Sequence, residues 1–517
     1  MGDRVRRWAA SGVLALAASS ALAQTRVSQP AAEPAASAPA APQSPAAAPP
    51  VAVAAAPVSL SARKVYEQAR PSLVQIRTVL KGGPSQTSVG SGFLVTPQGH
   101  IVTNFHVVSE AALKPERYDL VYVTADGREA PLVILQLDVL HDLALLRAAD
   151  AGAPLPATGT DGGTSAGSAK ATSAGAAGAT PSAGSGKSTS AKGTSANPGP
   201  VAGAAARGFE PLPFRPANQP LAQGERIYSL GNPLDVGFTI TQGTYNGLVR
   251  RSFYPQIFFG GALSAGMSGG PALDDEGHVV GINVARRVDG EQVSFLVPAE
   301  FAVELLARGK DAAPLIGPAY AIVDEQLQKH QAALTDRFIA QGWKEATHPR
   351  YRVPVPPDVF MRCWGTSEVS RTGGLDFERS ECQMDTRIFV GDYTTGTISL
   401  RHESYDGSKL GPLRFAARYS QSFRNESFVR PLPSQHQTKP RCSEDFVDRD
   451  GLPLRAVVCM RAYKKLPQLY DVAVLVATLD QNEAGVQGRF DAQGVTFANA
   501  QRLVRHYLDA YRWAQPH

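Results

Sequence analysis

The sequence has no cysteine before residue 363, and its four cysteines all lie in the last third of the chain, at Cys363, Cys382, Cys442 and Cys459. A zinc site is one interpretation, but no C-x-x-C pair and no nearby pair of histidines supports it. In an exported protein an even, clustered set predicts disulfides, and four cysteines allow three pairings. Proximity in sequence favours Cys363 with Cys382 and Cys442 with Cys459.

Long apolar runs are absent after the first 24 residues, since no later stretch approaches the roughly 18 apolar residues of a membrane helix. Residues 1–23 predict a secretory signal peptide, with Arg4, Arg6 and Arg7 before a short apolar stretch and an A-x-A cleavage site at 21–23. We therefore expect export across the inner membrane to the periplasm, with no stable membrane insertion after signal cleavage.

An excess of charge of one sign is also lacking. The net charge is +5, of which Asp3 and the three signal-peptide arginines contribute +2. The small, scattered remainder argues against nucleic-acid binding. Four histidines, at positions 278, 402, 436 and 506, form no metal-ligand spacing and are expected to be structural or exposed. We expect no nucleic acid, no metal and no cofactor, and the oligomeric state stays undetermined.

Composition divides the chain into regions. Residues 24–57 are rich in alanine and proline and predict a disordered tether. Residues 58–310 contain short strand-like runs, interrupted by an insertion at about 152–208. From residue 157 to residue 200, 36 of 44 residues are Gly, Ala, Ser or Thr, a composition with too little apolar surface to fold. The rest of this region fits one all-β unit of two small barrels or a sandwich.

Residues 311–517 have a different character. A helix is expected over 319–345, strand-like runs such as "DVAVLVATL" follow, and "NAQRLVRHYLDAYRW" predicts an amphipathic final helix. The run "RHESYDGSK", which begins at 401, is expected to be a solvated hairpin. The pattern predicts an α+β domain held by disulfides, whose role the sequence does not indicate.

Three short runs in the all-β region contain the parts for nucleophilic attack on a carbonyl: "VTNFHVV" with His106, "HDLALL" with Asp142 and "GMSGGP" with Ser268. A serine hydroxyl needs a base to take its proton, and a neutral histidine suits that role. The imidazolium that forms needs a buried carboxylate beside it. Backbone N–H groups of Gly266 and Ser268 are candidates to hold the developing oxyanion.

Each of these residues also has a structural interpretation. His106 can be a core histidine, Asp142 a strand-end cap and Ser268 a turn residue. Their order within one β-rich region favours the catalytic interpretation. His141 is expected at the surface, because adjacent residues on a strand face opposite ways.

The region from about 60 to 310 resembles a trypsin-like serine protease of the Deg/HtrA family. "SVGSGFLVTPQGHIVTNFHVV" is similar to that family's histidine-bearing strands and "HDLALLR" to its aspartate motif. "GERIYSLGNP" and "GMSGGPALDDEGHVVGINVA" resemble the start of the second barrel and the serine loop. The resemblance implies an all-β, two-barrel chymotrypsin-like fold with His106, Asp142 and Ser268 as the triad and Gly266 with Ser268 framing the oxyanion hole.

The resemblance also implies four substrate-binding residues. Ala262 stands at the base of the pocket for the side chain before the scissile bond, and Asn283, Val284 and Ala285 form the strand that pairs with the substrate backbone. Since no carboxylate stands at position 262, the pocket favours an apolar side chain over lysine or arginine.

Two features depart from the family pattern. Met267 stands where the family commonly has asparagine, and no PDZ domain is recognised after the protease region. We expect an exported serine endopeptidase that acts on protein or peptide substrates, in particular unfolded or damaged envelope proteins. The alternative is an inactive protease-fold scaffold whose C-terminal domain binds a protein or cell-wall partner.

Overall fold

A computed structural model describes most of the chain after the tether: residues 60–83, 85–149, 210–286, 293–344, 348–369, 375–423 and 432–514. The expected signal peptide, tether and insertion lie outside these ranges. The residues in these ranges form one compact unit. Within the described ranges, no helix combines the length and the apolar character that a membrane crossing needs.

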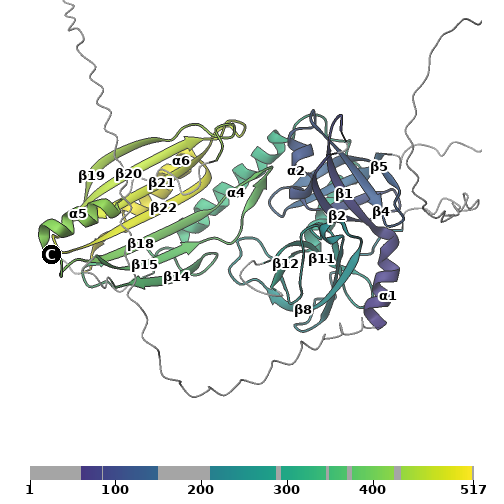
Figure 1. The fold of residues 1–517 in the computed structure, drawn as a ribbon, viewed down its shortest axis with the longest axis horizontal. Helices are drawn as coiled ribbons and strands as arrows, with labels where there is room; N and C mark the ends of the chain where they lie inside the picture. Colours follow the sequence, from purple (N-terminus) through teal and green to yellow (C-terminus); the bar gives the residue numbers. More distant parts are fainter. Residues whose placement is uncertain are drawn as a thin grey trace, which may run out of the picture. The chain divides into compact units, whose positions relative to one another are not determined.

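The first six strands close into a barrel in the order β1-β2-β3-β6-β5-β4 (Figure 1). Their bounds are β1 Leu73–Leu80, β2 Gln86–Leu94, β3 His100–Thr103, β4 Tyr118–Thr124, β5 Glu129–Asp138 and β6 Leu143–Ala148. Helix α1 (Leu60–Ala69) precedes the barrel, and α2 (Phe105–Leu113) joins β3 to β4.

Strand β6 is apolar along its length because both of its faces are buried. Ala144 and Leu146 face the core of the first barrel. Leu143 and Leu145 face a second cluster, which also contains Tyr228 from the next barrel. The aspartate motif therefore lies at the start of a strand that contacts both barrels.

The second barrel has the strand order β10-β11-β12-β9-β8-β7. Its strands are β7 Arg226–Gly231, β8 Thr239–Leu248, β9 Ile257–Phe259, β10 Pro271–Leu273, β11 Val279–Arg286 and β12 Ser294–Pro298. Helix α3 (Ala299–Gly309) follows. Two closed barrels confirm the expected chymotrypsin-like fold and exclude the sandwich.

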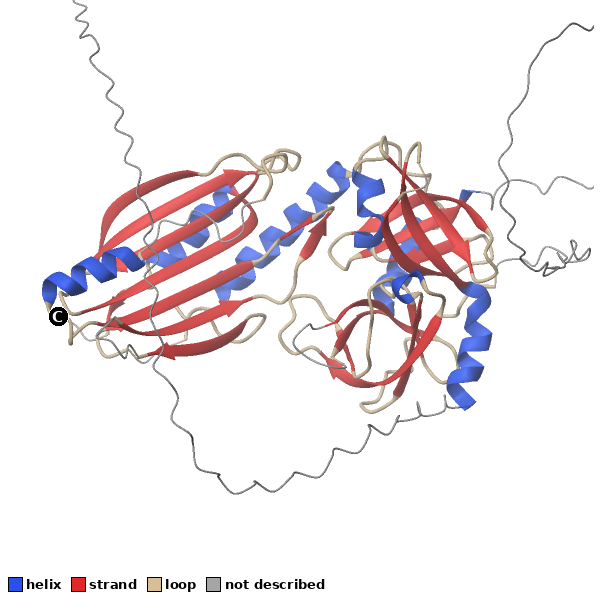
Figure 2. Cartoon of the chain, viewed as in Figure 1, coloured by secondary structure: helices blue, strands red, loops and turns tan. Residues whose placement is uncertain are grey.

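The C-terminal region is an antiparallel sheet of seven strands in the order β14-β15-β18-β22-β21-β20-β19, with helices on both faces (Figure 2). The strands are β14 Arg362–Glu368, β15 Asp376–Gln383, β18 Ile398–Asp406, β19 Arg441–Arg449, β20 Leu452–Ala462, β21 Leu469–Thr478 and β22 Ala484–Thr496. Helices α4 (Tyr320–Ala340) and α6 (Phe497–Leu508) pack on one face. Helix α5 (Pro412–Ser422) packs on the other.

Two short antiparallel pairs complete the region. They are β13 (Tyr351–Arg352) with β23 (Arg512–Trp513), and β16 (Ile388–Val390) with β17 (Tyr393–Thr395). The expected hairpin at "RHESYDGSK" is wrong, because most of these residues form β18 inside the sheet. His402 and Glu403 of that strand are buried rather than solvated.

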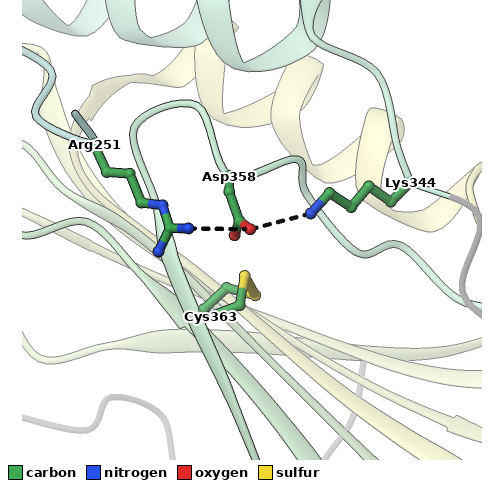
Figure 3. The surroundings of a disulfide bond; sticks show 5 residues. Arg251, Lys344, Asp358 and Cys363 are labelled. Carbon is green, nitrogen blue, oxygen red and sulfur yellow. Dashed lines mark hydrogen bonds and ion pairs between the residues drawn. A yellow bond between two sulfur atoms is a disulfide. The ribbon is translucent and has the colours of Figure 1, made fainter.

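Both disulfides join an edge strand to its neighbour, and both have the pairing that sequence proximity favours. Cys363–Cys382 links β14 to β15, and Cys442–Cys459 links β19 to β20. Beside the first disulfide, Asp358 forms ion pairs with Lys344 at 3.2 Å and with Arg251 at 3.7 Å (Figure 3). Because Arg251 belongs to the connection between β8 and β9, this ion pair ties the second barrel to the C-terminal region.

Helix α4 contributes to two hydrophobic cores. Val323 and Leu327 are buried in the core of the first barrel, whereas Leu334 and Phe338 are buried in the core of the C-terminal sheet. The side chain of Gln326 adds two hydrogen bonds to the first barrel, of 2.8 and 2.9 Å. The barrels and the sheet are therefore packed together through one continuous helix.

Candidate active site

His106 and Asp142 form a doubly hydrogen-bonded pair in the first barrel. His106 is the second residue of α2, and its Nδ1 lies 2.7 Å from Asp142 Oδ2. The backbone N–H of His106 donates to Asp142 Oδ1 at 2.8 Å. Since both carboxylate oxygens accept from the same residue, the ring nitrogen facing Asp142 carries the hydrogen and Nε2 is left to act as a base.

The backbone around Asp142 fixes the position of its carboxylate. Asp142 has a φ of 56°, a left-handed conformation that aspartate tolerates better than most residues. Its carbonyl oxygen accepts hydrogen bonds from Phe105 N and from Asn104 Nδ2, at 3.0 and 2.9 Å. The segment before β6 and the start of α2 are therefore locked together.

The electrostatics of the pair favour a charged imidazole. Burial lowers the pKa of His106, but the charge of Asp142 and its hydrogen bond raise it, and the net pKa lies above the ordinary histidine value. About a quarter of the His106 side chain, 24%, stays exposed. The ring can therefore accept a proton from a neighbouring group and hold it beside the Asp142 side chain.

Ser268 lies on a turn of the second barrel that packs against the first. Ser91 N in β2 donates to Ser268 O at 2.8 Å. Gly269 has a φ of +84°, and a Cβ there would overlap the carbonyl oxygen of Ser91 and the hydroxyl of Thr103. Glycine is therefore required at 269, and its close approach brings Ser268 to the β3–α2 segment that carries His106.

The turn also leaves two backbone donors free. Gly266 has a φ of +92°, its carbonyl accepts from Ser91 Oγ at 2.7 Å, and the preceding carbonyl, of Ala265, accepts from Leu234 N at 2.9 Å. Within the described residues, the N–H groups of Gly266 and Ser268 donate to no acceptor. Both remain available for an oxyanion.

The hydroxyl of Ser268 points to a backbone carbonyl. Its Oγ donates to Val284 O at 3.3 Å, and in the described part of the chain it has no hydrogen bond to His106. In proteins without substrate, catalytic hydrogen bonds are often long or unformed. A hydrogen bond from Ser268 to His106 Nε2 would require Oγ to turn away from Val284 O.

The four expected substrate-binding residues fall in different environments. Ala262 is exposed on the segment between β9 and the serine turn. Asn283 cannot pair with a substrate backbone, because its N–H donates to Gly270 O and its carbonyl accepts from Gly269 N, both at 2.9 Å. Its side chain is buried as well. Val284 and Ala285 follow at a register shift in β11, where the carbonyl of Val284 faces the serine.

Met267 supports the turn from inside. Its side chain is 2% exposed and belongs to a buried cluster of the second barrel. A Cβ at Gly231 would meet its Cα at 2.8 Å, so the turn lies tightly against β7. Met267 is thus a core residue, and the donors on either side of it belong to the backbone.

The sequence analysis missed one residue beside the His106–Asp142 pair and placed another wrongly. The ring of Phe389, from β16 of the C-terminal region, lies 5.0 Å from the His106 ring. No local pattern marks this contact, because it depends on tertiary packing.

His141 is not a surface residue as expected: it stacks on Phe301 at 3.7 Å and contacts Asp138 at 3.0 Å. The strand-alternation argument fails because β6 begins only after the left-handed Asp142.

One group of described residues has the composition of a metal site. Asp274, Glu276 and His278 lie together in the turn between β10 and β11. Asp274 Oδ1 accepts from the backbone N–H groups of Glu276 and His278, at 3.1 and 2.8 Å, and its other oxygen lies 3.3 Å from Arg215. The carboxylate is thus already used to fix the turn.

Comparisons with known proteins find a peptidase domain in the same part of the chain. Residues 90–204 and 201–282 match the family model of the trypsin-like peptidase domain. The chain is 24% identical over 285 residues to Protease Do-like 1, chloroplastic, of Arabidopsis thaliana, covering 51% of each chain. It is 30% identical over 138 residues to Serine protease Do-like HtrA of Bacillus subtilis, covering 23% of this chain and 31% of the relative.

A third relative is the Probable periplasmic serine endoprotease DegP-like of Hahella chejuensis, 26% identical over 44% of this chain and 37% of its own. The solved serine endoprotease of Yersinia pestis aligns with 48% of this chain and 67% of its own, at 20% identity and a TM-score of 0.33. The chain spans about half the length of its curated relatives or less. The two-barrel region is a trypsin-like peptidase domain that resembles those of the Deg/HtrA serine proteases.

Proposed function

We propose that this protein is a serine endopeptidase with His106, Asp142 and Ser268 as its triad. The observation that carries the proposal is the doubly bonded His106–Asp142 pair, placed beside a serine turn with two free backbone donors. A structural histidine or a turn serine has no need of both features together.

In the proposed reaction, Ser268 Oγ attacks the peptide carbonyl while its proton passes to His106 Nε2. Asp142 stabilises the imidazolium, and the N–H groups of Gly266 and Ser268 hold the oxyanion. His106 then protonates the leaving amine. Water, activated by the same histidine, hydrolyses the acyl-enzyme on Ser268.

The side chain before the scissile bond is proposed to enter a pocket that begins at Ala262. This residue carries no charge that would retain lysine or arginine, and the nearby ring of Phe259 is fully buried. The carbonyl of Val284 is close enough to the serine to accept the N–H of the substrate residue that is attacked. We expect cleavage after Val, Ala, Leu or Met, which mass spectrometry of casein fragments can check.

We further propose that the protein is exported to the periplasm and cleaves unfolded or damaged envelope proteins. The signal-peptide pattern of residues 1–23 supports export, and one similar protein is named as a probable periplasmic endoprotease. The paired cysteines fit an oxidising compartment.

The decisive experiment compares the mature protein with Ser268→Ala and His106→Ala variants. The proposal expects casein cleavage and covalent labelling by a fluorophosphonate probe in the wild type, and neither in the variants. Circular dichroism checks that the variants are folded. A folded wild type that neither cleaves nor labels would contradict the proposal and favour the inactive scaffold.

A further inference from the structure

Phe389 places the C-terminal region against the proposed catalytic histidine. The residue lies in the middle of β16, between Ile388 and Val390, which are buried in the core of the first barrel. Phe389 itself is only partly buried and packs against the same core. Its ring meets that of His106 at a centroid distance of 5.0 Å and an angle of 40°.

Phe389 also lines a cavity of about 560 Å³. Its walls are formed by the β16–β17 pair, by residues next to these two strands and by the seven-stranded sheet. The lining residues are Glu381, Gln383, Met384, Arg387, Phe389, Gly391, Asp392, Tyr393, Thr394, Thr397, Ile398, Ser399, Leu432, Asp471, Asp491 and Gln493. Phe389 is therefore a wall shared by His106 and the cavity.

The cavity floor is one face of the seven-stranded sheet. Gln383, Ser399 and Asp491 are direct cross-strand neighbours on β15, β18 and β22. Within the described residues, the side chains of Gln383 and Ser399, and that of Thr394 in the wall, make no hydrogen bond. Amide and hydroxyl groups of this kind pair well with the N–H and C=O groups of an extended polypeptide.

The charges of the cavity are mostly compensated. Asp471 pairs with Arg461 at 2.9 Å, and Asp491 pairs with Arg489 at 2.6 Å. The remaining lining charges are one glutamate, one arginine and an aspartate beside His436. An occupant therefore needs no strong charge of either sign, whereas the rings of Phe389 and Tyr393 offer it apolar contact.

We propose that Phe389 and this cavity form a substrate subsite, in which the C-terminal region binds an extended stretch of the polypeptide next to the bond that is cut. The inference rests on the proposed peptidase function. An extended chain advances about 3.3 Å per residue. A substrate side chain within two or three residues of the attacked carbonyl therefore reaches the ring of Phe389 and the mouth of the cavity.

The first test compares cleavage of casein by the wild type and by Phe389→Ala. We expect the ratio of casein cleavage to fluorophosphonate labelling to fall about tenfold, because the probe is too small to use the cavity. The fragment profile should lose its preference for large apolar residues within three positions of the cut. Phe446→Ala is the matched control, since Phe446 is an exposed phenylalanine of the same sheet outside the cavity. An unchanged ratio and profile in Phe389→Ala would overturn the subsite.

The second test measures binding without catalysis. In the Ser268→Ala protein, Phe389 is replaced by the photoreactive residue p-benzoylphenylalanine and the protein is irradiated with reduced, carboxymethylated casein. We expect a cross-linked product that disappears when Ser399→Trp fills the cavity floor. Absence of the cross-link overturns the subsite whatever the wild-type activity. A cross-link in a protein whose wild type neither cleaves nor labels supports the subsite and contradicts the peptidase.

Discussion

The two barrels and the C-terminal sheet deal with unpaired strand edges in different ways. Each barrel is closed, so every strand has two neighbours and no edge is left. The C-terminal sheet is open, and its edge strands β14 and β19 are each tied to their neighbour by a disulfide. Closure of the barrels fixes the segments that carry His106, Asp142 and Ser268. The disulfides strengthen the edges of a separate sheet, which shares no strand with the barrels.

The largest expected effect on one region alone is the loss of activity when Asp142 is replaced. The change Asp142→Asn keeps the size of the side chain but removes the charge that holds the His106 tautomer, so the rate of casein cleavage should fall about 10⁴-fold. The sheet should be unaffected, which tryptophan fluorescence can show: Trp343, Trp364 and Trp513 all lie after residue 310. A loss of less than tenfold would contradict the role assigned to Asp142.

A smaller effect tests whether the two regions are independent. Leu327→Ala removes a fully buried side chain that α4 contributes to the first barrel, at a cost of about 2–5 kcal/mol in unfolding free energy. Because α4 spans both cores, we expect urea unfolding to shift equally when followed by fluorophosphonate labelling of the barrels and by tryptophan fluorescence of the sheet.

The matched variant Leu334→Ala lies on the same helix but in the core of the sheet. It should shift both signals as well. If Leu327→Ala moves only the labelling midpoint and Leu334→Ala only the fluorescence midpoint, the barrels and the sheet unfold separately and the coupling is disproved.

Removing one edge disulfide is expected to destabilise the sheet. Cys442→Ala with Cys459→Ala opens a link between residues 17 positions apart, and disulfides that close loops of this length contribute about 3 kcal/mol. The midpoint of the tryptophan transition should fall accordingly. A double variant as stable as the oxidised wild type would show that the strand pairing alone holds this edge.

The smallest effect concerns pH. Because Asp142 raises the pKa of His106 above the ordinary value of about 6.5, labelling of Ser268 should fall on acidification with a midpoint above that value. The sign for stability is opposite: protonated His106 stabilises the fold below its unfolded pKa, and this contribution is lost as pH rises through the folded pKa. In Asp142→Asn the midpoint of labelling should drop, and an unmoved midpoint would contradict the assignment.

The barrels were more predictable than the sheet, for a physical reason. The three motifs are short local runs, and proteins with similar motifs share the two-barrel fold that brings these residues together. A resemblance in sequence therefore predicts the arrangement of the residues in space. The two barrels and the nearness of Ser268 to the histidine segment follow from this. The strand order of the C-terminal sheet depends on contacts far apart in sequence, which no local run encodes.

Three residues had environments that the local sequence did not predict correctly. Asn283 belongs to a motif that predicts substrate pairing, yet the glycines after Ser268 use both of its backbone groups. His402 stands among charged residues and is nevertheless buried in β18. Phe389 carries no signal at all, since its position depends on the packing of β16 against the first barrel.

Helix α4 has a mechanical consequence. Its 21 residues span about 30 Å, and the two ends are embedded in different cores. Between them His330 contacts Tyr254 of the second barrel at 2.8 Å and Gly396 of the C-terminal region at 2.8 Å. A helix held in this way transmits force between the two regions. A pull on the C-terminal sheet therefore acts directly on the barrels. The two regions can separate only if the middle of α4 unfolds or bends.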